Sequence, residues 1–124
     1  MQALGPNQLK WIEALESGNY EQGVMYLNQN GKMCCLGVGC EIFNAEKVKT
    51  KDHQATMYKD TPLPVSASAP QFLVKTLALA DALGEPCEGK QGKCLSVLND
   101  TGITFKEIAQ LLRANPEVYF TESR

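Results

Sequence analysis

The stretch Lys32–Phe43, KMCCLGVGCEIF, carries three of the chain's five cysteines and two of its glycines. Within it, Leu36, Cys40 and Phe43 recur at helical spacing, which predicts a short helix over residues 37–45. The apolar residues just before that helix predict a strand. The stretch is therefore expected to contain a strand-to-helix junction.

Cys34 and Cys35 fall at this junction. In a reducing compartment free cysteines act mostly as small hydrophobic residues, so we expect these two to serve as packing residues. Gly37 and Gly39 follow at once, and a residue without a Cβ lets a helix approach another backbone closely. The stretch is thus interpreted first as core.

A β-hairpin is predicted immediately upstream of the junction. Two short apolar stretches, Val24–Leu27 and Met33–Leu36, flank a polar connection that ends in Asn30-Gly31. Asn and Gly both tolerate positive φ, which tight hairpin turns require. The expected order is therefore strand, turn, strand and short helix.

The remaining helices are predicted from periodicity and end signals. An amphipathic helix over residues 6–17 has Pro6 in its first turn. A second long helix is predicted over residues 69–83, and its expected buried stripe comprises Phe72, Leu73, Leu77, Ala80 and Leu83. The stretch CLSVLND, residues 94–100, fits either a short helix or a buried strand.

The C-terminal part of the chain has the clearest local signal. Thr104 and Glu107 have the spacing of a capping box, which predicts a helix that Asn115-Pro116 ends. The tail after it is expected to form an edge strand or to dock through Tyr119 and Phe120. Together these elements predict a small α+β fold, as a single domain over residues 1–124.

Composition restricts the class of protein. The 124 residues are 44% hydrophobic and 21% charged, with a net charge of −2, which fits a globular domain and disfavours nucleic acid as a partner. No apolar run reaches the length of a membrane span, and the N-terminus lacks the pattern of a secretory signal. We therefore expect an intracellular protein without a membrane partner.

The segment between residues 44 and 68 is a long polar connection that offers few apolar anchors, with one or two edge strands at most. Long loops in compact domains are often functional, so it is a candidate lid or partner-facing segment. It also contains the only histidine, His53.

The cysteines could in principle bind a metal or act as nucleophiles. Their spacings do not match the short paired ligands of structural zinc sites, so no metal and no cofactor is expected. A cysteine at a helix start can have a depressed pKa. Cys34 or Cys35 with His53 as base is therefore the catalytic alternative, as a hydrolase or transferase.

Two polar clusters are candidates for ligand contact. The first comprises Asn19, Tyr20 and Gln22, and the second comprises Asn99 and Asp100. Both combine short polar groups with a tight backbone, although Asn-Asp pairs often merely stabilise their own turn.

Three segments resemble a group of short, mostly uncharacterised proteins predicted in tailed-phage and prophage genomes. The matching segments are Trp11–Gly23, Cys34–Glu41 and Leu98–Ala109, and they carry the motifs W-[IV]-x-A-L, Y-x-Q-G, C-C-L-G-V-x-C and L-N-D-x-G-x-[ST]-F-x-E-I-A. The resemblance implies a viral origin and an accessory role in the host cytoplasm.

The leading hypothesis is therefore a non-enzymatic phage accessory protein that binds a host protein or a small anionic ligand. Counter-defence, by sequestering a nucleotide signal, is one form of that role. A virion structural or assembly protein is a further alternative. A homo-oligomer would let so small a chain build a pocket between subunits.

Overall fold

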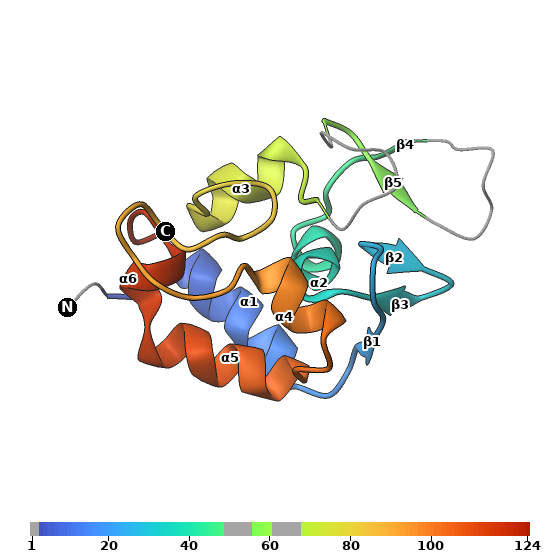
Figure 1. Cartoon of the computed structure of the whole chain (residues 1–124). Coiled ribbons are helices and arrows are strands. Elements are labelled where there is room, and N and C mark those ends of the chain that lie inside the picture. The colour runs from blue at the N-terminus through green and yellow to red at the C-terminus, as the bar shows by residue number, and fades with distance from the viewer. Residues whose placement is uncertain (1–2, 49–55, 61–67) are drawn as a thin grey trace.

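The computed structural model describes residues 3–48, 56–60 and 68–124, and within these it contains six helices and two small sheets (Figure 1). The helices are α1 (Pro6–Glu16), α2 (Cys35–Ile42), α3 (Gln71–Leu77), α4 (Leu95–Asp100), α5 (Phe105–Ala114) and α6 (Pro116–Tyr119). The strands are β1 (Glu21–Gln22), β2 (Asn28–Gln29), β3 (Lys32–Met33), β4 (Lys47–Val48) and β5 (Met57–Tyr58). The predicted α+β class is confirmed.

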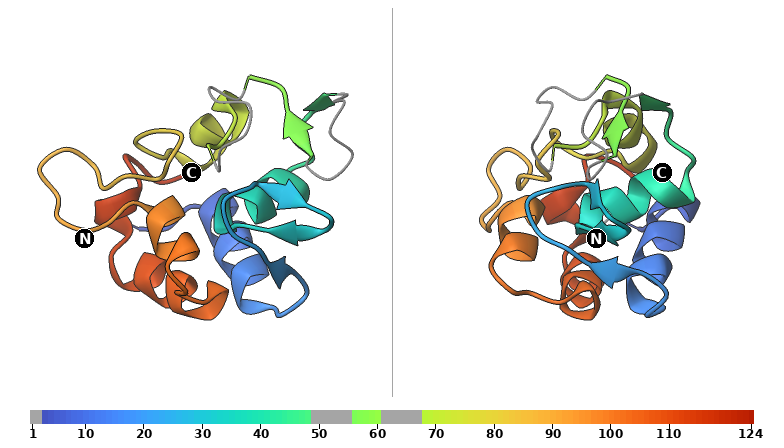
Figure 2. Two further views of the ribbon diagram at one scale, coloured as in Figure 1. Left: turned by 45° about the vertical axis from the view of Figure 1, so that its right-hand side comes forward. Right: turned by 90° about the vertical axis from the view of Figure 1, so that its right-hand side faces the viewer.

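Helices and strands occupy opposite ends of the molecule. Helices α1, α4, α5 and α6 gather at one end and both small sheets lie at the other, with α2 between them (Figures 1 and 2). Helix α1 packs against α5 and α2. None of the helices in the described parts of the chain is both long and apolar enough to cross a lipid bilayer.

Helix α1 forms where the sequence predicts it, with Pro6 at its first position. Its buried face includes Trp11, Ile12 and Leu15, which are at most 1% exposed. The Trp11 ring meets Phe120 edge to face, with 6.2 Å between centroids. This contact joins the first helix to the C-terminal tail through large apolar surfaces.

The predicted hairpin is present, but its strands are displaced. Asn30 and Gly31 form the turn with φ of 54° and 84°, and β2 pairs antiparallel with β3. The segment Val24–Leu27, predicted as a strand, is instead a loop between β1 and β2. Met25 there has φ of 70°, which is incompatible with a strand. Strand β1 adds to the sheet by pairing parallel with β3.

Helix α2 begins at Cys35 and ends at Ile42, somewhat before the predicted range of 37–45. A methyl group on Gly37 would overlap the carbonyl oxygen of Leu27, and one on Gly39 would come within 2.9 Å of the Leu73 side chain. The prediction that the glycines permit close backbone approach is confirmed for Gly37, whereas Gly39 makes room for a side chain. The helix is consequently inserted into the core.

Helix α3 is shorter than predicted, because it ends at Leu77 rather than continuing to residue 83. Ala78 adopts a left-handed conformation, and Leu79 N–H closes the end by donating to the Val74 carbonyl at 3.0 Å. The residues after the end pair with the tail instead, through an isolated bridge between Leu79 and Phe120. Tertiary pairing here overrides helix propensity.

The shortened helix overturns part of the predicted buried stripe. Leu73 and Leu77 are buried as predicted, but Phe72 is 47% exposed and Ala80 is also exposed. Ala80 and Leu83 lie beyond the helix end, so they no longer share a face with Leu77. Phe72 lies in the first turn of α3, so its exposure is independent of the early end.

The sequence leaves two alternatives open in the C-terminal half, for residues 94–100 and for the tail after α5. CLSVLND forms helix α4, and the predicted capping box of α5 is present: Glu107 N–H donates to Thr104 Oγ1 at 3.2 Å and Thr104 N–H donates to Glu107 Oε1 at 3.1 Å. The tail docks through Tyr119 and Phe120, both at most 2% exposed.

The 44–68 connection contributes the short antiparallel pair of β4 and β5, in agreement with the expected edge strands. Residues 49–55 and 61–67, and with them His53, lie outside the described residues.

Replacing Gly37 with Ala is expected to destabilise the protein by about 3 kcal/mol or more, because the new methyl group meets rigid backbone. Gly39→Ala is the matched control in the same helix. Its methyl group meets the flexible Leu73 side chain, and Ala favours the helix, so the loss is expected to stay within about 1 kcal/mol. Urea unfolding measures both; equal losses would contradict the packing argument.

Candidate functional site

Asn99, predicted as a ligand contact, is 1% exposed and uses its whole side-chain amide internally. Its Oδ1 accepts from Gln22 Nε2 at 3.0 Å and from Cys35 N–H at 3.1 Å. Its Nδ2 donates to the Gly23 carbonyl at 2.8 Å and to Asp100 Oδ1 at 3.3 Å. These four bonds fill the capacity of a primary amide, so Asn99 ties β1, α2 and α4 together.

Gln22 extends this network to the start of α5. Its Nε2 also donates to the Ile103 carbonyl at 2.8 Å, and its Oε1 accepts from Phe105 N–H at 3.2 Å. Phe105 is the first residue of α5, and the first N–H groups of a helix have no partner within it. The Gln22 amide therefore satisfies a helix end and orients the sheet on that helix.

The network includes Trp11 as well. Trp11 Nε1 donates to the Cys35 carbonyl at 2.9 Å, while the Cys35 N–H is bound by Asn99. We call Trp11, Gln22, Cys35 and Asn99 the Asn99 hub. One or more of its members come from each of the three segments that carry the sequence resemblance. Those segments thus meet in a structural centre.

The other predicted contact residues lie around the hub. The Asp100 carboxylate accepts from Met25 N–H at 2.9 Å and so holds the loop between β1 and β2 in its left-handed conformation. Tyr20 packs partly buried against the core, and Asn19 is exposed with its N–H donating to Ser17 Oγ. The structure brings Gln22, Asn99 and Asp100 together and leaves Asn19 outside. Their role as ligand contacts stays a prediction.

Cys34 and Cys35 are fully buried. Burial raises the pKa of the Cys34 thiol to about 11, and it raises the pKa of Cys35 well above its ordinary value, with a further contribution from the Cys34 charge. The depressed pKa expected for a catalytic thiol at this junction is therefore wrong. Desolvation outweighs the helix N-terminus here, and the proposed base, His53, lies outside the described residues.

The other thiols offer no metal site within the described residues, where no group of three or more His, Cys, Asp or Glu could hold an ion. Cys40 is buried, and burial raises its pKa also. Cys87 and Cys94 are half-buried in and beside the loop before α4.

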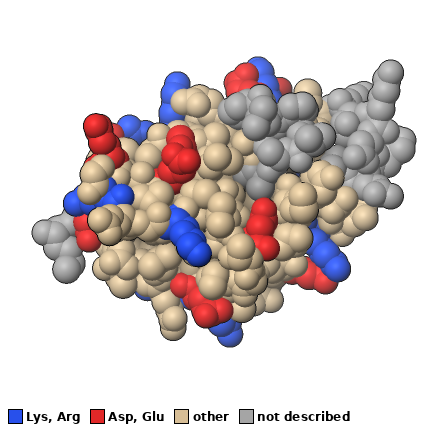
Figure 3. Space-filling model, viewed as in Figure 1, with Lys and Arg blue, Asp and Glu red and all other residues tan. Residues whose placement is uncertain are grey.

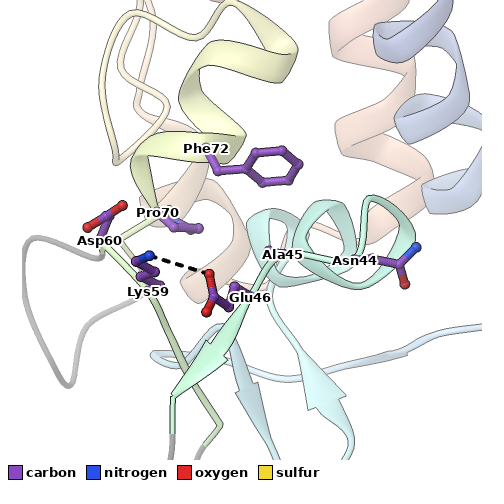
Figure 4. Close-up of a pocket in the computed structure, with 7 residues that line it drawn as sticks. All are labelled: Asn44, Ala45, Glu46, Lys59, Asp60, Pro70 and Phe72. Atoms are coloured by element: carbon purple, nitrogen blue, oxygen red, sulfur yellow. Dashed lines mark ion pairs between the residues drawn. The ribbon is translucent and has the colours of Figure 1, made fainter.

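A pocket of about 300 Å³ lies between the turn after α2 and the start of α3 (Figure 4). We call it the Phe72 pocket, and its lining residues are Asn44, Ala45, Glu46, Lys59, Asp60, Pro70 and Phe72. The half-exposed Phe72 ring stands on one side, and the Glu46 carboxylate with Lys59 Nζ stands on the other (Figure 4). The pocket thus combines an aromatic surface with an ion pair.

Backbone bonds fix the walls of the Phe72 pocket. Lys59 N–H donates to the Glu46 carbonyl at 2.8 Å, which continues the pairing of β4 and β5. Gln71 N–H donates to the Asp60 carbonyl at 3.2 Å, which joins the end of β5 to α3. The side chains of Lys59 and Glu46 form an ion pair with 3.6 Å between Nζ and Oε2.

Two further hollows are smaller. One of about 240 Å³ adjoins the Phe72 pocket, sharing Asn44 and Ala45 with it. The other, of about 260 Å³, is lined by Gln22, Gly23, Val24, Gln29 and Lys32. Gln22 lines this second hollow, but the nitrogen and the oxygen of its side-chain amide both form hydrogen bonds inside the protein.

On the face seen in Figure 3, positive and negative side chains are interspersed.

Sequence reasoning placed the Phe72 pocket only in part. It marked the 44–68 segment as partner-facing, and that segment supplies most of the lining, including Glu46 and Lys59. It missed Phe72, which was predicted to be buried. Phe72 lies in the first turn of α3, and its place at the pocket depends on the contact between the start of α3 and Asp60, which the local residues do not indicate.

Comparison with known proteins gives one family. A family model described as a domain of unknown function, DUF8296, matches residues 7–116. No curated protein and no solved structure gives a significant match.

Replacing Asn99 with Ala is expected to cost about 3 kcal/mol or more of unfolding free energy, because it leaves buried partners of a four-bond amide unsatisfied. Asn19→Ala is the control, since Asn19 is exposed, and it should change stability by less than about 0.5 kcal/mol. Chemical denaturation of both variants gives the comparison. A loss of unfolding free energy in Asn99→Ala as small as that in Asn19→Ala would contradict the structural role of Asn99.

The thiols should separate into two classes on alkylation of the folded protein with iodoacetamide near pH 8. Burial and raised pKa values should leave Cys34, Cys35 and Cys40 unmodified, whereas the half-buried Cys87 and Cys94 react. Unfolding in urea should make all five reactive. Peptide mapping by mass spectrometry locates the adducts, and rapid labelling of Cys34 or Cys35 in the folded state would revive the catalytic alternative.

Proposed function

Since the chain belongs to the DUF8296 family, whose description is a domain of unknown function, we propose a function from the geometry of the site. The protein is a non-enzymatic accessory protein of a tailed phage or prophage, and it binds a host protein at the Phe72 pocket. The resemblance of three segments to phage-encoded proteins supports the origin, and the pocket supports the binding role.

The observation that carries the proposal is the exposure of Phe72. A phenylalanine that is 47% exposed costs free energy in water, and this one stands over a pocket rather than on a flat surface. Aromatic side chains surrounded by polar groups are typical of the centres of protein interfaces. Lys59 and Glu46 supply such a polar surround beside it.

Charge favours a protein over a small anionic ligand at this pocket. The described lining residues carry two carboxylates, those of Glu46 and Asp60, and one ammonium, that of Lys59. An anionic ligand would meet net repulsion there, whereas an interface with mixed or positive side chains would not.

The pocket also favours binding over catalysis. Its lining, so far as the structure describes it, supplies no thiol and no hydroxyl nucleophile. Burial raises the pKa of the Cys34, Cys35 and Cys40 thiols and so keeps them protonated. Neutralising a host factor by occupying its surface, as in counter-defence, needs binding alone.

A photo-crosslinking amino acid placed at Phe72 tests the proposal in bacterial cells that express the protein. We expect a discrete adduct with one host protein, identified by mass spectrometry. Val97 is the matched control position, because it is apolar, 42% exposed and located on α4 rather than at the pocket. The crosslinking amino acid at position 97 should give no such adduct.

The partner identified in this way is then purified and its affinity is measured. Phe72→Ala should weaken binding by about 30-fold, which corresponds to the loss of one interface hot spot. Val97→Ala should leave the affinity unchanged. Identical adducts at both positions, or equal affinities of both variants, would remove the pocket from the proposal.

A further inference from the structure

We propose that the Phe72 pocket receives an arginine side chain of the partner protein. The inference rests on the proposed binding function and names the group that enters the pocket. Three features carry it: an ion pair that leaves a carboxylate available, an exposed aromatic ring opposite that carboxylate, and an excess of negative charge in the lining.

The available carboxylate belongs to Glu46. Its ion pair with Lys59 spans 3.6 Å, which is longer than a hydrogen bond, and the two side chains are 71% and 60% exposed. A solvated pair of this kind contributes little stability. Lys59 can therefore be displaced from Glu46 at small cost.

The molecule itself shows how arginine binds a partly buried glutamate at the surface. Arg113 donates from Nε and Nη2 to the two carboxylate oxygens of Glu16, with both bonds at 2.7 Å. The lysine–glutamate pairs among the described residues are longer, at 3.6 to 3.7 Å; they are Lys32 with Glu21, Lys47 with Glu41, and Lys59 with Glu46. A guanidinium matches both oxygens of a carboxylate with two parallel bonds, whereas an ammonium is a compact charge without that fixed geometry. An incoming arginine would thus replace Lys59 on Glu46.

The Phe72 ring supplies the second contact. It lies across the pocket from the Glu46 carboxylate (Figure 4), so a guanidinium bound to Glu46 can place its flat face against the ring. Cations are attracted to aromatic faces, and arginine also stacks on them through its planar group. The chain already uses such a contact elsewhere, where Lys10 Nζ lies 5.4 Å from the centre of the Phe43 ring.

Charge balance selects a cation as the occupant. Asp60 adds a second carboxylate at the edge of the Phe72 pocket, so the described lining carries one more negative than positive charge. Arginine brings a positive charge that cannot be lost near neutral pH. Its guanidinium can pair with the Glu46 carboxylate and keep the contact with the ring. A glutamate or a phosphate would be repelled by the carboxylates.

Blocked tripeptides test the occupant directly, without knowledge of the partner. Acetyl-Gly-Arg-Gly-amide is titrated into isotope-labelled protein and followed by two-dimensional NMR, with the citrulline, lysine and glutamate analogues in parallel. Citrulline matches arginine in shape but lacks its charge. We expect saturable shifts at Glu46, Lys59 and Phe72, with arginine binding in the ~mM range and about fivefold or more tighter than citrulline.

Two variants locate the binding. Glu46→Gln keeps the shape of the side chain and removes its charge, so it should weaken arginine binding about fivefold. Glu88→Gln is the matched control, since Glu88 is exposed in the loop before α4, and it should leave binding unchanged. Phe72→Leu should also weaken it by removing the aromatic face while keeping an apolar side chain.

The outcomes separate the occupant from the function. Equal binding of arginine and citrulline, preference for the glutamate peptide, absence of saturable shifts at the pocket, or an unchanged affinity in Glu46→Gln would each overturn the arginine assignment. If crosslinking at Phe72 still captured one host protein, the proposed function would stand without it. If crosslinking at Phe72 captured no host protein although the arginine peptide bound at the pocket, the proposed function alone would be overturned.

Discussion

The fold depends on a buried primary amide. Asn99 lies 1% exposed among apolar side chains, and an amide in that position is tolerated only when its donors and acceptors are all paired. Its four bonds reach β1, the start of α2 and its own helix. A satisfied network of this kind specifies one arrangement of elements, because any slip leaves a buried group without a partner.

The hub and the tight packing of α2 act together. Trp11 binds the Cys35 carbonyl, Asn99 binds the Cys35 N–H, and Gly37 lets the same helix press against the Leu27 backbone. Cys34, Cys35 and Cys40 are 0% exposed and pack as small apolar side chains in the core around this helix. The residues that carry the sequence resemblance therefore identify a scaffold. The Phe72 pocket is lined by other residues, at 44–46, 59–60 and the start of α3.

Local features were predictable from sequence wherever neighbouring residues alone specify the conformation. The Asn30-Gly31 turn, the proline start of α1 and the capping box of α5 all fall in this class. The polar residues Gln22 and Asn99 were also marked as special, but their chemistry was assigned to a ligand. Sequence does not tell an internal partner from an external one, because both need the same donors and acceptors.

By itself, the sequence determined the α+β class, the hairpin turn, the helix ends with capping signals and the packing role of the cysteines. Only the tertiary structure decided that α3 stops at Leu77, because residues 78 and 79 pair with the C-terminal tail instead of extending the helix. The start of α3 is likewise held by a tertiary contact, since Gln71 N–H donates to the Asp60 carbonyl, and Phe72 in that first turn lines the pocket with Glu46 and Lys59. Contacts between segments far apart in the chain thus create the pocket, and periodicity within one segment carries no information about them.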